Sequence, residues 1–117
     1  MPRFVILEHD HPFPHWDFML ESREVLRTWR LSALPVPGQA VAAEPIGDHR
    51  MAYLDYEGPV SRGRGKVVRW DAGTFEWEED TAERVVVRLA GGKMRGEAVL
   101  QESDPGWTMS LRITVVP

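Results

Sequence analysis

The amino-acid sequence predicts a single all-β domain whose strands form an antiparallel β-barrel. Two features of its 117 residues lead to this prediction. Short runs rich in β-branched and aromatic residues are separated about every 8 to 12 residues by Gly, Pro or Asp turn signals, a pattern typical of sandwiches and barrels. Helical periodicity is sustained nowhere. Closure into a barrel is favoured because it leaves no unpaired strand edge exposed.

The first three expected strands are residues 3–8, 15–21 and 24–31. The first is an apolar run that ends before the prolines at positions 12 and 14, which cannot donate to a β-ladder. The second alternates polar and apolar side chains with the period of a strand that has two different faces. The third ends before the Pro and Gly turn signal at 35–38.

Seven further strands complete the predicted sheet. They are residues 39–43, 52–56, 66–70, 74–78, 84–90, 97–101 and 107–115. Turn chemistry separates them at 58–59, 63–65, 71–73, 91–92 and 104–106, where Gly, Pro and Asp gather. No linker, repeat or low-complexity tract divides the chain, so residues 1–117 are expected to form one domain.

Composition narrows the function classes. The net charge of −4 argues against non-specific binding to long duplex DNA, which depends on neutralising phosphates. The chain has no cysteine, so any metal must be held by His, Asp, Glu or Tyr, and a reducing compartment is favoured. No apolar run has the length of a membrane span, and no signal-peptide pattern opens the chain. We therefore expect a cytoplasmic protein without membrane association.

A candidate metal site lies in the second expected strand and the loop before it. Alternation places His15 and Asp17 on one face of the strand, while Trp16 and Phe18 project from the other. His9 comes from the preceding segment and adds a second imidazole. Two nitrogens and one carboxylate suit Mn, Zn or Fe at an open, catalytic kind of site.

These residues also lie in a family-like motif. The segment 8–21, EHDHPFPHWDFMLE, resembles the motif H-D-x4-H-Y-D-x-R-L-E that opens the 3′-phosphoesterase domain of bacterial DNA ligase D. Segments 47–58 and 70–76 are similar to that family's E-D-H-P-x-x-Y-x-x-F-E-G and W-D-x-G-T-W-E, and residues 89–96 to a later glycine-containing motif. The four motifs occur in the family's order and span about residues 4 to 112.

The resemblance implies a manganese-dependent enzyme that removes 3′-terminal phosphates or ribonucleotides from DNA ends during repair. It implies that His9, His15 and Asp17 bind the metal, and that His49 and Tyr53 form a second catalytic pair. That pair could instead be a turn histidine beside a core tyrosine. His11 has no counterpart in the motif and is expected to be a loop residue or a partner of a metal ligand.

Three positions depart from the family. Met19 stands where the motif has an arginine, and alternation places it beside His15 and Asp17. Ala33 and Val41 fall near two further basic positions of the family. A lost charge-assisted phosphate contact costs about 1.5 to 3 kcal/mol, so turnover is expected to be weak unless Arg50 or Arg64 contacts the phosphate from another direction.

Two function classes therefore remain open. The first is a stand-alone metal-dependent phosphoesterase acting on nucleic-acid 3′ ends, with any ligase or polymerase partner supplied in trans. The second is a non-catalytic metal-binding barrel that serves as an interaction module. The basic residues at 62, 64, 66 and 69 suit phosphate recognition but equally suit a solvated turn. Turnover of a 3′-phosphate primer with manganese distinguishes the two classes.

Overall fold

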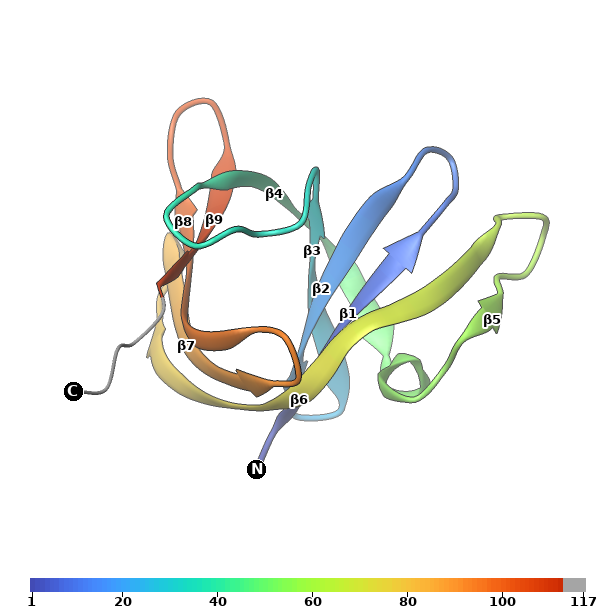
Figure 1. Ribbon diagram of the computed structural model, residues 1–117, viewed down its shortest axis with the longest axis horizontal. Helices are drawn as coiled ribbons and strands as arrows, with labels where there is room; N and C mark the ends of the chain where they lie inside the picture. The colour runs from blue at the N-terminus through green and yellow to red at the C-terminus, as the bar shows by residue number, and fades with distance from the viewer. Residues whose placement is uncertain (113–117) are drawn as a thin grey trace.

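The computed structural model describes residues 1–112, and their fold is a closed antiparallel β-barrel (Figure 1). The elements are β1 Arg3–His9, β2 His15–Ser22, β3 Val25–Leu31, β4 Val41–Arg50, the 3₁₀ helix η1 Met51–Leu54, β5 Gly58–Pro59, β6 Lys66–Asp80, β7 Arg84–Gly91, β8 Arg95–Glu102 and β9 Trp107–Arg112. The strand order is β1-β2-β3-β4-β9-β8-β7-β6-β5, and pairing of β1 with β6 closes eight strands into a ring. The predicted fold class is confirmed.

The barrel interior holds the larger of two apolar clusters. Every strand of the eight-stranded ring contributes to it, with Phe4 and Ile6 from β1, Phe18 from β2, Phe75 from β6 and Leu100 from β8 among its fully buried members. These side chains alternate along their strands with residues on the other face of the sheet. The alternation that the sequence shows therefore reports a real inside and outside of the barrel.

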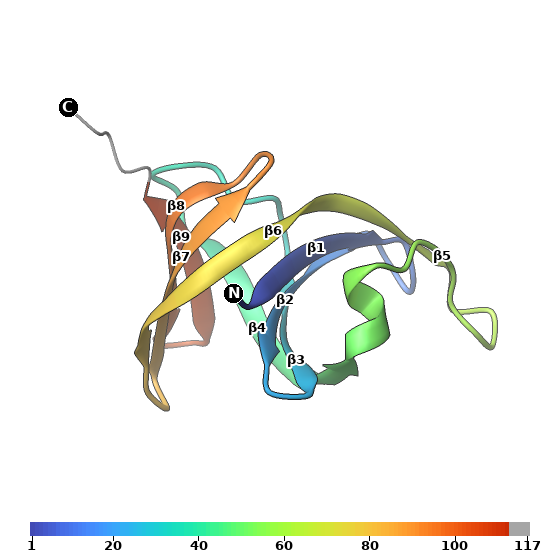
Figure 2. The ribbon, with the colours of Figure 1, turned by 90° about the horizontal axis from the view of Figure 1, so that it is seen from below.

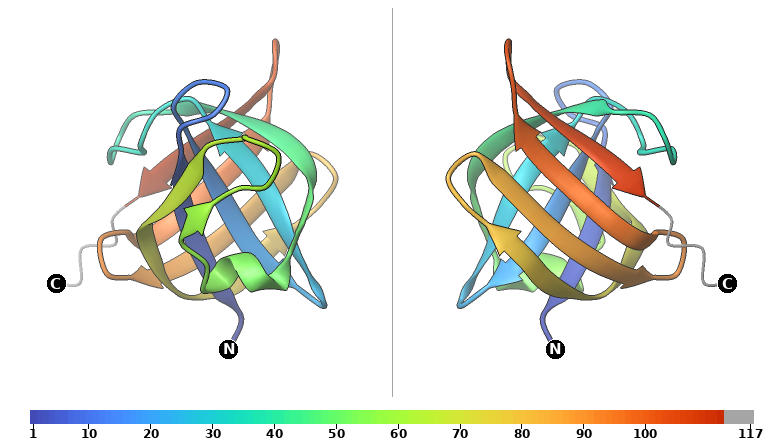
Figure 3. Two further views of the ribbon diagram at one scale, coloured as in Figure 1. Left: turned by 90° about the vertical axis from the view of Figure 1, so that its right-hand side faces the viewer. Right: turned by 90° about the vertical axis from the view of Figure 1, so that its left-hand side faces the viewer.

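A second apolar cluster covers the outer face of β1, β2 and β3. It contains Val5, Leu7, Met19, Leu26, Leu54 and Val67, with Tyr53 and Met51 packed against them. Figure 2 shows η1 and the β5 segment on the side of β1–β3 that faces away from β7, β8 and β9. The left view of Figure 3 shows η1 lying across the same strands. β1 and β2 are therefore covered on both faces along much of their length.

Two sequence predictions are wrong in the middle of the chain. Residues 52–56 were expected as a strand, but Met51–Leu54 is a 3₁₀ helix, closed by the N–H of Asp55 donating to the Ala52 carbonyl at 3.2 Å. This turn places Leu54 in the second apolar cluster, where it is 3 % exposed. Tertiary packing thus decides the conformation of a short apolar run that periodicity alone leaves ambiguous.

The second wrong prediction is the turn at 71–73. The expected strands 66–70 and 74–78 are one continuous strand, β6, which bends past β1 with a register shift between Ile6 and Leu7. The carboxylate of Asp71 accepts hydrogen bonds from the backbone N–H groups of Gly92, Lys93 and Met94 at 2.9, 3.1 and 2.7 Å. Asp71 therefore stabilises the neighbouring β7–β8 turn and does not itself form a turn.

The other expected strands are present with shifted ends. β4 runs to residue 50 instead of 43, and β5 occupies the expected break at 58–59. The described part of the last expected strand is β9, and residues 113–115 lie outside the described residues. No helix within residues 1–112 is long and apolar enough to cross a membrane.

We predict that Asp71→Ala lowers the free energy of unfolding by about 2 to 4 kcal/mol, because three backbone donors, of which that of Met94 is buried, lose a charged acceptor. Urea denaturation followed by tryptophan fluorescence measures the change. Asp104→Ala, in the exposed turn at 104–106, is the matched control and should change stability by no more than about 0.5 kcal/mol. Equal effects of the two substitutions would contradict the role given to Asp71.

Candidate functional site

A pocket of about 420 Å³ lies on the outer face of β1–β3, beside the second apolar cluster. Its floor is the sheet, and its walls come from the 9–15 loop, η1 and the segment around β5. The lining residues are His9, His11, Pro12, Asp17, Met19, Arg30, Ile46, Asp48, His49, Arg50, Tyr53, Val60, Arg64 and Val67. The pocket thus gathers chemically active side chains from four separate parts of the sequence.

Strand pairing brings the predicted metal ligands together. β1 and β2 are antiparallel, with His9 opposite His15 and Leu7 opposite Asp17. Directly opposed residues share a face, so the two histidines and the aspartate project to the same side of the sheet. His15 is 1 % exposed and Asp17 3 %, whereas the side chain of His9 is 16 % exposed at the pocket wall. The expected convergence of these three residues is present in the structure.

Backbone carbonyls fix the orientation of both imidazole rings. A ring nitrogen of His9, Nε2, lies 2.8 Å from the carbonyl oxygen of Arg64, and Nδ1 of His15 lies 2.9 Å from that of Phe13. A carbonyl oxygen can only accept, so these nitrogens must donate. In the neutral ring, Nδ1 of His9 and Nε2 of His15 therefore carry lone pairs. Such outer hydrogen bonds are the usual means of orienting histidine ligands.

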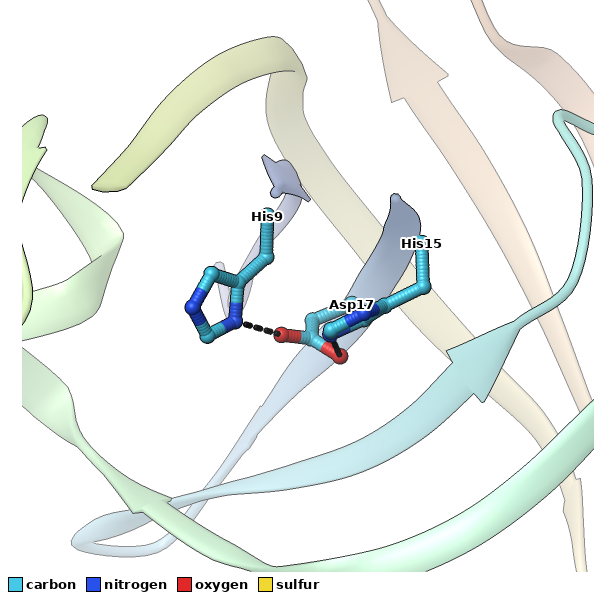
Figure 4. Close-up of side chains that lie close together, drawn as sticks. All are labelled: His9, His15 and Asp17. Atoms are coloured by element: carbon cyan, nitrogen blue, oxygen red, sulfur yellow. Dashed lines mark ion pairs between the residues drawn. The ribbon is translucent and has the colours of Figure 1, made fainter. Parts of the chain in front are cut away.

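Both lone pairs point toward the carboxylate of Asp17 (Figure 4). His9 Nδ1 is 3.7 Å from Asp17 Oδ2, and His15 Nε2 is 3.4 Å from Asp17 Oδ1. Both distances exceed the 2.7 to 2.9 Å of a charge-assisted hydrogen bond. Nε2 of His15 and Oδ1 of Asp17 are buried and have no hydrogen-bond partner within residues 1–112. The three residues thus bring three electron-pair donors within 4.8 Å of one another, an arrangement that favours a cation.

This arrangement fits a divalent metal ion. Each of the three residues offers one ligand atom, and the set of two imidazoles and one carboxylate matches the chemistry of Mn, Zn or Fe. An ion between them would satisfy the two buried atoms that otherwise lack a partner. The open side of the set faces the pocket, which leaves room for a further ligand.

The predicted second pair lies across the same pocket. His49 is the next-to-last residue of β4 and Tyr53 belongs to η1, with their ring centroids 5.7 Å apart in an edge-to-face arrangement. Nδ1 of His49 donates to the Gly47 carbonyl at 3.0 Å, which leaves Nε2 as the nitrogen available to other groups. Tyr53 also packs on the second apolar cluster, so it is both a pocket residue and part of the packing.

The 9–15 loop crosses the 60–65 turn in close contact, and this crossing holds the loop in place. The backbone N–H of Lys66 donates to the Asp10 carboxylate at 2.8 Å, and this hydrogen bond lowers the pKa of Asp10 below its ordinary value. The contact is therefore present at neutral pH and is lost only as the pH falls through that lowered pKa. Gly65 makes the crossing possible: a Cβ there would lie 2.7 Å from His11 Cβ and closer still to the Asp10 carboxylate.

Comparison with known proteins gives this pocket a family context. The family model of the DNA ligase D 3′-phosphoesterase domain matches residues 7–102. The chain belongs to this family. It is 36 % identical over 118 residues to the multifunctional non-homologous end joining DNA repair protein LigD of Mycobacterium tuberculosis, a match that covers 89 % of the chain. The corresponding protein of Pseudomonas aeruginosa is 33 % identical over 86 residues, or 69 % of the chain.

The match is local with respect to these relatives. It spans 15 % of the Mycobacterium tuberculosis protein and 10 % of the Pseudomonas aeruginosa protein. A third relative, from Mycolicibacterium smegmatis, is 30 % identical over 122 residues, which is 90 % of the chain and 16 % of that protein. The chain therefore corresponds to one small part of each multifunctional relative.

The structure also locates the residues at which the sequence departs from the family motif. Met19 is 1 % exposed, belongs to the second apolar cluster and lines the pocket beside Asp17. Ala33 is exposed and Val41 packs against the barrel core, and neither lines the pocket. Arg50 and Arg64, expected as alternative phosphate ligands, both do. The guanidinium of Arg64 is partly engaged by Ser61, through bonds of 2.9 and 3.1 Å.

Arg30 was not predicted as a pocket residue. This residue lies on β3 directly opposite Asp17 and lines the pocket. The signal was present in the sequence, because a hairpin with a two-residue turn at 23–24 pairs residue 17 with residue 30. That turn carries no Asn-Gly or Asp-Gly signature, and Arg23 adopts a positive φ of 62° instead. The register could therefore not be assigned from turn chemistry.

We predict that Gly65→Ala perturbs the pocket and that Gly63→Ala does not. Both glycines have positive φ, 74° and 65°, so each alanine costs about 1 to 2 kcal/mol of backbone strain. Only a Cβ at Gly65 meets the 9–15 loop, whereas one at Gly63 meets nothing within 4 Å. Thermal unfolding and the ring ¹⁵N resonances of His9 and His15 measure the effects. Indistinguishable histidine spectra in the two variants would contradict this role of the crossing.

Proposed function

We propose that the chain is a metal-dependent phosphoesterase domain that acts on 3′-phosphate or 3′-ribonucleotide ends of DNA in repair. The observation that carries the proposal is the convergence of His9, His15 and Asp17 beside a pocket that also holds His49 and Tyr53. Membership of the DNA ligase D 3′-phosphoesterase domain family supports the reaction class and the repair context. Manganese is the metal that the family resemblance implies.

The three proposed ligands are pre-organised before any ion binds. His15 and Asp17 sit on a strand that is packed on both faces, and His9 is held by the Arg64 carbonyl. Little side-chain entropy is lost on binding because the rings are already fixed. A divalent ion held there supplies Lewis-acid polarisation of a phosphoryl oxygen and activation of water near neutral pH.

His49 is the proposed proton carrier. Its Nδ1 is occupied by the Gly47 carbonyl, so Nε2 is the atom that exchanges a proton or donates to a phosphate oxygen. The edge of Tyr53 restricts the ring from one side, and the half-exposed position of His49 at the pocket wall keeps Nε2 accessible. Leaving-group protonation and stabilisation of negative charge are both consistent with that position.

DNA ends are the proposed substrate because the pocket is small, cationic and open. Three guanidiniums, from Arg30, Arg50 and Arg64, stand against two carboxylates, from Asp17 and Asp48, which gives the lining a charge of +1 before any metal is bound. A pocket of about 420 Å³ admits a terminal phosphate and part of its nucleoside. The net charge of −4 for the whole chain disfavours binding along a duplex, so recognition at an end is the better fit. Ligase or polymerase partners would act on the same ends.

One observation favours the second function class, a metal-binding barrel without turnover. Met19 presents an apolar side chain to the pocket, beside Asp17. A protein that binds metal tightly and releases no phosphate from any 3′ end would belong to that class. Measuring Mn²⁺ binding and phosphate release on the same protein separates the two classes.

We predict that the wild-type protein releases inorganic phosphate from a 3′-phosphate primer when Mn²⁺ is added, and that EDTA abolishes the release. Asp17→Asn should lose both Mn²⁺ binding and turnover. His49→Ala should keep Mn²⁺ binding, because it contributes no proposed ligand, and should slow turnover by about 10² to 10⁴-fold. Electron paramagnetic resonance of free Mn²⁺ and a phosphate-release assay measure the two properties.

The two substitutions test different parts of the proposal. Unchanged Mn²⁺ affinity in folded Asp17→Asn would refute the proposed metal site. Mn²⁺ binding by the wild type without phosphate release would refute the phosphoesterase activity and support the interaction module. Retained turnover in His49→Ala would remove His49 from the catalytic machinery.

A further inference from the structure

Three arginines line the pocket, and of these only Arg30 belongs to the strands β1–β3 that form the pocket floor. It is on β3, in the same cross-strand row as Leu7 and Asp17, and the next row holds Met19 opposite Thr28. Arg50 ends β4 on the exposed rim, and Arg64 belongs to the turn at 61–65. Arg30 is therefore held by a central strand, next to the proposed metal ligands, where its backbone position is well fixed.

The guanidinium of Arg30 has no partner within residues 1–112. Its Nε is buried without a hydrogen bond, and the side chain forms no ion pair or hydrogen bond in that part of the chain. This is unusual because Asp17 stands directly opposite on the neighbouring strand, where an arginine and an aspartate ordinarily pair. The Asp17 carboxylate faces His9 and His15 instead.

A half-buried cation without an anionic partner is unfavourable unless a ligand supplies the anion. The remaining pocket carboxylate, Asp48, is exposed and forms no ion pair with Arg30. Arg64 already donates to Ser61, and Arg50 is exposed to solvent, which weakens its electrostatic contribution. Of the three guanidiniums, that of Arg30 is in the least solvated position, and unlike that of Arg64 it donates no hydrogen bond within residues 1–112.

We infer that Arg30 is the residue that binds the terminal phosphate of the substrate, in the position beside Asp17 where Met19 offers no charge. The inference rests on the proposed function and assigns its anion-recognition group. The planar guanidinium suits bidentate contact with two phosphate oxygens. Its location in the row of Asp17 directs it to the oxygens of a phosphate that also approaches the His9, His15 and Asp17 set.

With Arg30 as the phosphate ligand, the absence of an arginine at residue 19 does not leave the pocket without a phosphate-binding group. The family's arginine is missing at residue 19, but a guanidinium enters the same pocket from the next strand. Phosphate recognition is thus supplied by β3 instead of β2. The substrate class stays the same, and the residue that discriminates a phosphate end from a hydroxyl end is Arg30.

The test compares two otherwise identical oligonucleotides, one ending in a non-hydrolysable 3′-methylenephosphonate and one in a 3′-hydroxyl, by fluorescence anisotropy with Mn²⁺ present. The wild type should prefer the phosphonate end. Arg30→Gln should lower phosphonate affinity by about 10- to 100-fold and leave hydroxyl-end affinity within about two-fold. Arg30→Lys should be intermediate, because a lysine keeps the charge without the planar fork.

Two controls separate phosphate recognition from a structural role. Arg95→Gln, an exposed arginine on β8, should leave both affinities unchanged. Mn²⁺ affinity of Arg30→Gln, measured by electron paramagnetic resonance, should equal that of the wild type. Loss of affinity for both ends alike, loss of Mn²⁺ binding, or an unchanged phosphonate preference in Arg30→Gln would overturn the inference. A wild type that binds Mn²⁺ but shows no phosphonate preference would overturn both this inference and the proposed substrate class.

Discussion

The structure depends on the packing of β2 against apolar side chains on both of its faces. Phe18 and Leu20 fill the barrel interior, while Met19 on the other face packs under η1 with Val5 and Leu7. A shift of this strand by one residue would exchange its two faces and place His15 and Asp17 in the apolar interior of the barrel. The register with β1 and β3 is therefore fixed. Every pocket residue on the floor takes its position from that register.

The same packing buries polar atoms of His15, Asp17 and Arg30 on β2 and β3. Polar groups are normally excluded from such positions or are fully hydrogen-bonded there. Here the buried Nε2 of His15 and Oδ1 of Asp17 face each other without a proton donor between them, and the Nε of Arg30 is also unpaired. Buried polar groups without partners lower the local stability, a feature that is common at functional sites. A cation between the carboxylate and the imidazoles, and an anion at Arg30, would complete the arrangement.

The sequence predicts the barrel and the convergence of His9, His15 and Asp17, but not the parts that depend on distant contacts. Alternation in residues 15–20 is enough to place His15 and Asp17 on one face. The 3₁₀ helix at Met51–Leu54 and the unbroken β6 were missed, because packing of Leu54 and the hydrogen bonds of Asp71 decide them. Arg30 was not predicted as a pocket residue because its position depends on the register of the β2–β3 hairpin. That register is set by a turn without a glycine signature.

The most direct test of the proposed metal centre is anomalous diffraction at the manganese edge from crystals of the protein soaked in Mn²⁺ near neutral pH. One strong anomalous peak is predicted within bonding distance of His9 Nδ1, His15 Nε2 and an Asp17 carboxylate oxygen. A well-ordered pocket with no peak at that point, and with Nε2 of His15 instead hydrogen-bonded directly to Asp17, would contradict a metal-dependent function for this fold.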